Sequence, residues 1–270
     1  MEVQVKRTLV VPPLPSRETE EAPLTVFDLV APTYHVTVLF AFSPPNPTTS
    51  ALLDALSATL SHFPLLTARI ERRGGRRQVH HTVSAHVWKK ITAVRGLDAG
   101  ARTSVNVSVN GRARLGTAAV PNGFFGNLII TASSGATARE LTTGTLADAA
   151  ALVRAGIRAV DRRYFQSFID FGALHVDGGS DEEEPLEPAN VEDPGVLSPD
   201  VDSDSWLHLE LHRLDLGRGG RLAGIMPAKV PEDGVVVVMP SLRKDGGVEV
   251  FVALWEKHAH ELTNIAYTMD

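Results

Sequence analysis

Residues 34–64, YHVTVLFAFSPPNPTTSALLDALSATLSHFP, hold the pattern that sets the fold class. Their first part alternates apolar and other residues with a period of two, which predicts a half-buried strand over 34–42 that a run of prolines ends. The second part predicts a helix, because Thr48, Thr49 or Ser50 can cap it and its leucines share one face. A strand followed at once by an amphipathic helix is typical of proteins that mix both elements.

The rest of the chain adds further elements of both kinds. Alternating or short apolar runs predict strands over 2–11, 103–110, 124–132, 206–212, 235–239 and 248–254. Helical patterns predict helices over 86–94 and 145–165 and from Glu256 onward. Together these elements predict an α/β protein of the α+β type, with antiparallel strands and packed helices.

Two segments are typical of loops. Residues 176–200 combine Gly, Pro and many acidic residues, which predicts an exposed, mobile loop. Residues 71–78, ERRGGRRQ, place arginines around two glycines. We interpret them as a solvated turn between strands rather than as a phosphate site.

Composition excludes several classes of function. A chain of 270 residues with 43% hydrophobic and 21% charged residues is a folded protein of one large or two ordinary domains. The absence of cysteine excludes thiol chemistry and Cys-based metal sites, and the net charge of −6 argues against nucleic-acid and membrane partners. We find no P-loop, dinucleotide-binding or HExxH motif, and neither a signal peptide nor a membrane segment, so we expect a cytoplasmic protein.

Histidines supply the candidates for chemistry. His80 and His81 lie at an expected strand end, where a neutral imidazole can accept a proton from a hydroxyl or amine; the alternative is that both only pack at a strand-to-helix join. His258 and His260 resemble metal ligands, but residues two apart on a helix point to different sides, so we expect no metal site. Residues 215–220 read as a Gly-rich turn.

Four groups of segments, in the same order along the chain, resemble the plant BAHD acyl-CoA-dependent acyltransferases. The subgroup that they resemble most is the grass hydroxycinnamoyltransferases that act on amines such as agmatine or tryptamine. The segments are FDLVAPTYHVTVLFAFSPP with LLDALSATLSHFPLLTARIE, AHVWKKITAVRGLD with VNGRARLGTAAVPNGFFGN, RYFQSFIDF with LSPDVDSDSWLHLELHRLDLGRGGRLAGIMP, and VVVVMPSLRKDGGVEVFVALWEKHAHELTNIAYTMD.

The resemblance implies a two-lobed fold related to chloramphenicol acetyltransferase. We expect a shortened first lobe at 1–79 and a second lobe at 80–270, with the segment around 215–240 packing back on the first. In the family, the His of an HxxxDG motif takes the acceptor's proton, and the nucleophile attacks the thioester of an acyl-CoA co-substrate. A monomer with no bound cofactor or metal is implied, with an amine or alcohol as acceptor.

The match departs from the family at its motifs. His81 matches the catalytic His, but Ala85 and His86 stand where HxxxDG has Asp and Gly. Counting from His80 instead reaches Ser84, which is no better.

The family's DFGWG signature, a structural support there, is matched in part. Asp215, Gly217 and Gly219 agree with it, while Leu216 and Arg218 replace its aromatic pair.

An internal deletion within the first lobe would explain the short chain. It would expose the apolar residues of the 34–42 strand and the leucines of the following helix. Two alternatives to an active acyltransferase follow from these departures. One is an inactive remnant that acts through binding, and the other is a lobe that binds CoA without transferring the acyl group.

Overall fold

The protein is described from a computed structural model. The described residues are 11, 25–29, 31, 36–62, 77–121, 124, 126–176, 197–209, 211–217, 220–228, 230, 233–243 and 247–269. Three expected segments lie largely outside them. They are the strand at 2–11, apart from Val11, the turn at 71–78, whose last two residues instead begin a helix, and the acidic loop at 176–200, apart from Val176 and residues 197–200.

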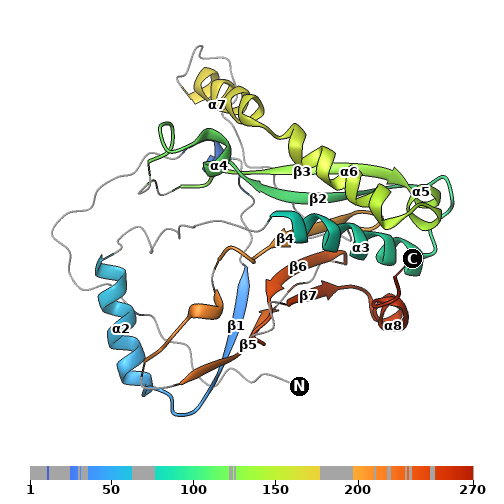
Figure 1. Ribbon diagram of the computed structural model, residues 1–270. Helices are drawn as coiled ribbons and strands as arrows, with labels where there is room; N and C mark the ends of the chain where they lie inside the picture. The colour runs from blue at the N-terminus through green and yellow to red at the C-terminus, as the bar shows by residue number, and fades with distance from the viewer. Residues whose placement is uncertain are drawn as a thin grey trace.

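A five-stranded sheet forms the centre of the molecule (Figure 1). Its strand order is β3 (Ile129–Thr137), β2 (Arg102–Asn110), β4 (Val201–Ser205), β6 (Val235–Pro240) and β7 (Val248–Ala253). The three inner strands β2, β4 and β6 are parallel, and both outer strands are antiparallel to their neighbours. The mixed sheet and its helices confirm the expected α/β class, whereas the parallel pairing of β2, β4 and β6 corrects the expectation of antiparallel strands.

Helices cover one face of this sheet and enclose the main core. They are α3 (Arg77–Arg95), α5 (Ala138–Thr143) and α6 (Leu146–Ala159). Strand β2 alternates strictly, so that Val105, Val107 and Val109 are buried in the same core as Trp88 and other helix residues. Trp88 is completely buried and its indole N–H donates to Thr103 Oγ1 at 3.1 Å.

The opposite face of the sheet is apolar at one end and polar at the other. A ribbon of β1 (Thr37–Ser43) and β5 (Arg221–Ala228), paired antiparallel, packs against the apolar end through Val38 and Ile225. These residues form a second, smaller core with Val237 and Met239 of β6. At the other end, β2 and β4 present serine, asparagine and aspartate.

The N-terminal segment is anchored by aromatic packing. Phe27, in the single turn α1 (Val26–Leu29), lies 5.9 Å from Phe165 and 5.1 Å from Phe168, centroid to centroid. Both phenylalanines belong to α7 (Arg162–Val176), which also contacts the short helix α4 (Arg112–Leu115). α1 and α4 are thereby held on one helix.

Helix α2 (Thr49–His62) confirms the prediction made from residues 34–64, as does β1. Its Leu52 and Leu56 are 39% and 46% exposed, and Val36 and Phe40 are 64% and 37% exposed. Figure 1 draws α2 well away from the sheet. The apolar exposure expected from a shortened first lobe is therefore present in part, since Val38 packs in the smaller core and Leu60 is half-buried.

Three sequence predictions need correction. The helix expected over 145–165 is two helices, because Asp161 starts α7 by accepting the Tyr164 N–H at 3.0 Å. The strand expected over 124–132 starts later, at Ile129, because Asn127 before it makes loop contacts.

The strand expected over 206–212 is also wrong. β4 ends at Ser205, and the chain then turns, with the Leu209 N–H donating to the Trp206 carbonyl at 3.0 Å. A 3-10 turn, Leu211–Arg213, follows. The apolar residues that suggested a strand, Trp206 and Leu211, instead pack in the smaller core.

The other elements predicted within the described residues are confirmed. The helix expected over 86–94 is the longer α3, and the closing helix is α8 (Glu256–Ile265). The strands expected over 103–110, 235–239 and 248–254 are β2, β6 and β7. Among the described residues, no helix has the length and apolar character needed to span a membrane.

Candidate functional site

The carboxyl ends of three parallel strands meet at one edge of the sheet, a place where α/β proteins commonly bind ligands. Helix α3 runs antiparallel to these strands. Its last residue, Arg95, donates to the carbonyls of Pro199 and Asp200 just before β4. Further back along the helix, Ser84 of α3 shares a hydrogen bond of 2.8 Å with Ser203 in the middle of β4. The first turn of α3 therefore lies toward the end of β4.

His81 lies in that first turn and is partly buried. The backbone of His80 is helical too, and its side chain lies outside what the structure describes. The strand-to-helix join expected here is therefore wrong, because residues from Arg77 onward already belong to α3. His81 shares a helix face with Ser84 and Ala85, one turn further on.

Ala85 occupies the position of the motif's aspartate and is completely buried in the main core. Ser84, the corresponding residue counted from His80, is also buried and bonds to Ser203. Neither position supplies a carboxylate that could orient an imidazole. The motif's aspartate is thus absent at both positions.

Two carboxylates lie on the polar end of the sheet face that the helices do not cover. Asp202 accepts a hydrogen bond of 2.9 Å from the Asn106 side chain of β2. Burial raises the pKa of Asp202, with the Asp200 carboxylate acting in the same direction and the Asn106 bond opposing both. Burial likewise raises the pKa of Asp204, against a hydrogen bond from Ser108.

A buried ion pair fixes the start of β4. Arg95 and Asp233 meet at 2.7 Å with side chains 1% and 2% exposed, and the other Asp233 oxygen accepts the Trp255 N–H at 2.7 Å. With the two carbonyls that Arg95 also binds, this pair ties α3 to the beginnings of β4 and β6. Its role is to position the strands.

The turn expected at residues 215–220 is present in part. The Asp215 carboxylate accepts the Gly217 N–H at 2.7 Å, and Gly217 has a φ of +72°, which glycine adopts without strain. Gly219 lies outside the described residues. Asp215 is exposed and its hydrogen bond to Gly217 is local, so it shapes the turn that leads into β5.

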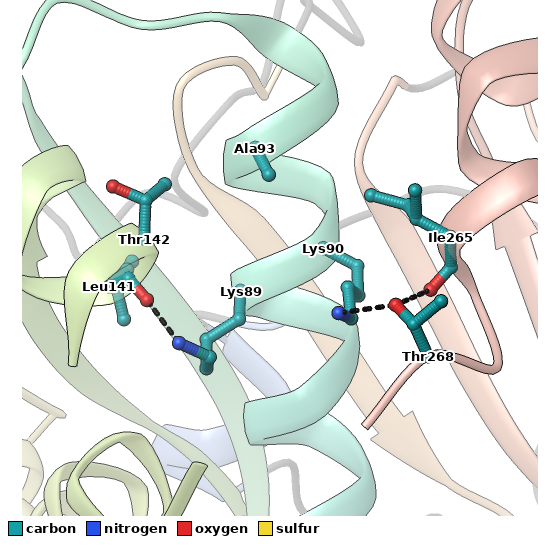
Figure 2. Close-up of a pocket in the computed structure, with 7 residues that line it drawn as sticks. All are labelled: Lys89, Lys90, Ala93, Leu141, Thr142, Ile265 and Thr268. Carbon is teal, nitrogen blue, oxygen red and sulfur yellow. Dashed lines mark hydrogen bonds between the residues drawn. The ribbon is translucent and has the colours of Figure 1, made fainter. Parts of the chain in front are cut away.

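A recess of about 260 Å³ lies on the outer side of α3, with Thr142 of α5 and the C-terminal segment as walls (Figure 2). Lys89 and Lys90 line it and are both almost completely buried. Lys89 donates to the carbonyls of Leu141 and Gly144, and Lys90 donates to Thr268 Oγ1 at 2.9 Å. These bonds fasten α5 and the C-terminal segment to α3.

His258 and His260 lie on α8, and His260 is exposed. Within the ranges that the structure describes, no three His, Asp or Glu side chains are grouped so as to hold a metal ion.

Comparison with known proteins decides the family. The model of the Transferase family matches residues 1–82 and 76–269. The chain belongs to the BAHD acyltransferase family. It is 37% identical over 220 residues to tryptamine hydroxycinnamoyltransferase 2 of Oryza sativa subsp. japonica, covering 81% of this chain and 49% of that protein. It is also 37% identical over 188 residues to agmatine coumaroyltransferase-1 of Hordeum vulgare, covering 70% of this chain and 42% of that protein.

The fold agrees with this membership. The F. sporotrichioides TRI101, solved in complex with coenzyme A and T-2, superposes with a TM-score of 0.55 at 20% identity, covering 94% of this chain and 54% of TRI101. The chain spans about half the length of the curated relatives that it matches. BAHD enzymes use acyl-CoA as co-substrate.

The two family matches overlap at residues 76–82, the segment that contains His80 and His81. This segment therefore resembles both the end of the family's first part and the beginning of a later part. The residues that precede AHVWKK, from Arg77 to Ser84, form the first turns of α3.

Sequence reasoning did not single out Asp202 and Asp204. The signal was present in VDSDS, where aspartate alternates with a β-branched or small residue, as expected for a strand with one polar face. The apolar residues of 206–212, directly after it, predict a strand more strongly than this polar alternation does.

Proposed function

We propose that this BAHD protein is an acyltransferase that moves a hydroxycinnamoyl-type acyl group from CoA to an amine or alcohol, with His81 as general base. The observation that carries the proposal is the place of His81 in the first turn of α3, toward the carboxyl ends of the parallel strands. The names of the rice and barley relatives, which specify tryptamine and agmatine, support an amine acceptor.

The chemistry needs one base and no covalent enzyme intermediate. His81 would take a proton from the acceptor N–H as the nitrogen attacks the thioester carbonyl. The tetrahedral intermediate would collapse by breaking the C–S bond, and the proton held by His81 would pass to the departing CoA thiolate. Without an aspartate to orient the imidazole, we expect turnover to be slow.

A second candidate is a protein that binds the same ligands without catalysis. The buried Ala85 favours it, because the motif's carboxylate is replaced by a methyl group inside the core. In this case His81 would be a structural residue of α3.

Release of free CoA thiol from p-coumaroyl-CoA, with agmatine or tryptamine as acceptor, separates the two candidates. The chain contributes no thiol background, because it has no cysteine. Release that His81→Ala abolishes and His260→Ala, on the exposed side of α8, leaves unchanged supports catalysis. A folded sample that releases no thiol supports the binding protein.

We further propose a shortened first lobe at 1–79 and a second lobe at 80–270, in a monomeric cytoplasmic protein. The overlap of the two family matches supports an internal deletion close to this boundary. The pairing of β5 with β1 supports the expectation that the segment around 215–240 packs back on the first lobe. Light scattering after gel filtration tests the monomer.

A further inference from the structure

A pair of buried serines joins helix α3 to strand β4. The hydroxyls of Ser84 and Ser203 share a hydrogen bond of 2.8 Å, and the two residues are 1% and 2% exposed. They lie 119 residues apart in the chain. Because buried hydroxyls need hydrogen-bond partners, this contact restricts how the helix and the strand face each other.

The surroundings of Ser203 on this face of the sheet are otherwise apolar. In the sheet register its neighbours are Val107 of β2 and Val236 of β6, and both valines belong to the main core. Ala85, which follows Ser84 on α3, is buried in the same core. Apolar packing is non-directional, whereas a hydrogen bond weakens steeply when its angle changes. The serine pair therefore adds a directional contact between this part of α3 and the sheet.

Ser84 follows His81 by three residues, slightly less than one helical turn. In an α-helix this spacing separates two residues by about 60° around the axis and about 4.5 Å along it. Further side-chain hydrogen bonds hold α3 at His86, Trp88, Lys89, Lys90 and Arg95. Of all these residues, Ser84 lies nearest to His81 along the helix.

We propose that Ser84 and Ser203 position the His81 imidazole, because their hydrogen bond holds the first turns of α3 in one rotation relative to β4. This inference rests on the proposed function for the reaction that His81 serves. Both serines are positioning residues, since they act through His81 and not on the substrate.

A small rotation of α3 is enough to affect proton transfer. An atom at the rim of a helix lies about 6 Å from the axis, so a rotation of about 10° moves it by about 1 Å. A general base must lie about 2.6–3.2 Å from the atom whose proton it takes. Misplacement by about 1 Å can cost about 100-fold in rate. Loss of the serine bond should therefore lower kcat, while contacts that bind the substrate elsewhere are kept.

Thiol release by Ser84→Ala, Ser203→Ala and the double variant tests the inference. Each single variant breaks the same bond, so each should lower kcat at least about tenfold and change KM for p-coumaroyl-CoA by less than about twofold. The double variant should lose no more than either single variant, because the bond is already absent.

Thr92→Val is the matched control for these variants. It also removes a hydroxyl that is almost completely buried on α3, but this hydroxyl donates to the Trp88 carbonyl at 2.8 Å, within the helix itself. Its kcat should match that of the wild type. Circular dichroism verifies that each variant is folded. If a single variant does not fold, the double variant takes its place, because it leaves neither serine hydroxyl without the other.

The imidazole of His81 gives a second readout that needs no turnover. In nitrogen-labelled protein, the long-range proton–nitrogen NMR signals that disappear in His81→Ala belong to this imidazole. Ser84→Ala and Ser203→Ala should both shift these signals, and Thr92→Val should not. Ser203→Ala is the more telling variant, because Ser203 lies on a different element from His81.

The outcomes separate this inference from the proposed function. Unchanged His81 signals in Ser203→Ala overturn the inference, as do an unchanged kcat, losses that add up in the double variant, or an equal loss in Thr92→Val. A wild type that releases no thiol rejects the proposed function. In that case, shifted His81 signals in both single variants still support positioning by the serine pair, and unchanged signals overturn it.

Discussion

The Asp28 carboxylate accepts the backbone N–H of Asn127 at 2.8 Å, and the Asn127 side chain donates to the carbonyl of the adjacent Phe27 at 2.9 Å. Ninety-nine residues separate Asp28 from Asn127 in the chain. This reciprocal contact joins the N-terminal segment to the loop that precedes β3. It explains how a short first part remains attached to the central sheet.

Asp28→Ala should therefore loosen the N-terminal segment without unfolding the sheet. We expect a loss of about 1–3 kcal/mol, since the N–H of Asn127 is left without its acceptor. Urea denaturation measures the free energy of unfolding, with Asp98→Ala as the exposed control. Equal stability of the two variants would contradict the anchoring role.

The ion pair between Arg95 and Asp233 predicts a larger effect. Arg95→Met should cost about 3–5 kcal/mol, because it leaves Asp233 buried without its cation. The double variant Arg95→Met with Asp233→Asn should recover part of this loss, because no uncompensated charge remains. If the double variant is no more stable than the single one in urea, the charge itself is not what destabilises Arg95→Met.

The sequence predicts those helices and strands whose ends do not depend on packing against distant parts of the chain. Strand β2 follows from periodicity, because its alternation matches the face that is buried. Helix α2 and strands β1, β6 and β7 are also predicted from their apolar patterns, although Leu52 and Leu56 in the leucine stripe of α2 are exposed. The end of β4 did not follow, because Trp206 packs in the smaller core instead of extending the strand. That packing depends on the distant ribbon.

The candidate site was predicted only in part for the same reason. His81 could be named from its match to the motif. The motif does not suggest that His81 lies inside a helix, and it does so because α3 already begins at Arg77. Asp202 and Asp204 become neighbours of Asn106 and Ser108 only through the parallel pairing of β4 with β2. No spacing in the sequence reveals a contact between strands so far apart.

The burial of Ala85 predicts that one substitution will not restore the motif. Ala85→Asp should destabilise the protein by several kcal/mol, because it places an unpaired carboxylate in the main core. Ala93→Asp is the matched control, since Ala93 lies on the exposed side of the same helix beside two lysines. Thermal melts of both variants provide the measurement, and a stable Ala85→Asp with faster thiol release would refute this prediction.

The exposed leucines of α2 predict a change in solubility rather than in stability. Leu52→Lys and Leu56→Lys should change the free energy of unfolding by no more than about 0.5 kcal/mol, as surface substitutions usually do. They should also reduce aggregation during concentration, because they break an exposed apolar face. Light scattering against protein concentration tests this. A large loss of stability would instead mean that the two leucines are buried in solution.

The raised pKa values of Asp202 and Asp204 predict a pH dependence of defined sign. In the folded protein these carboxyls hold their protons more tightly than in the unfolded chain, where an aspartate titrates near about 3.9. Their unfavourable contribution is therefore absent below about pH 3.9 and grows as the pH rises through the folded values. Asp204→Asn should be more stable than the wild type at neutral pH, and the difference should shrink on acidification. Melting temperatures of both proteins from neutral pH down to about pH 4 measure this convergence. A difference that is independent of pH would mean that Asp204 is not desolvated in the folded protein.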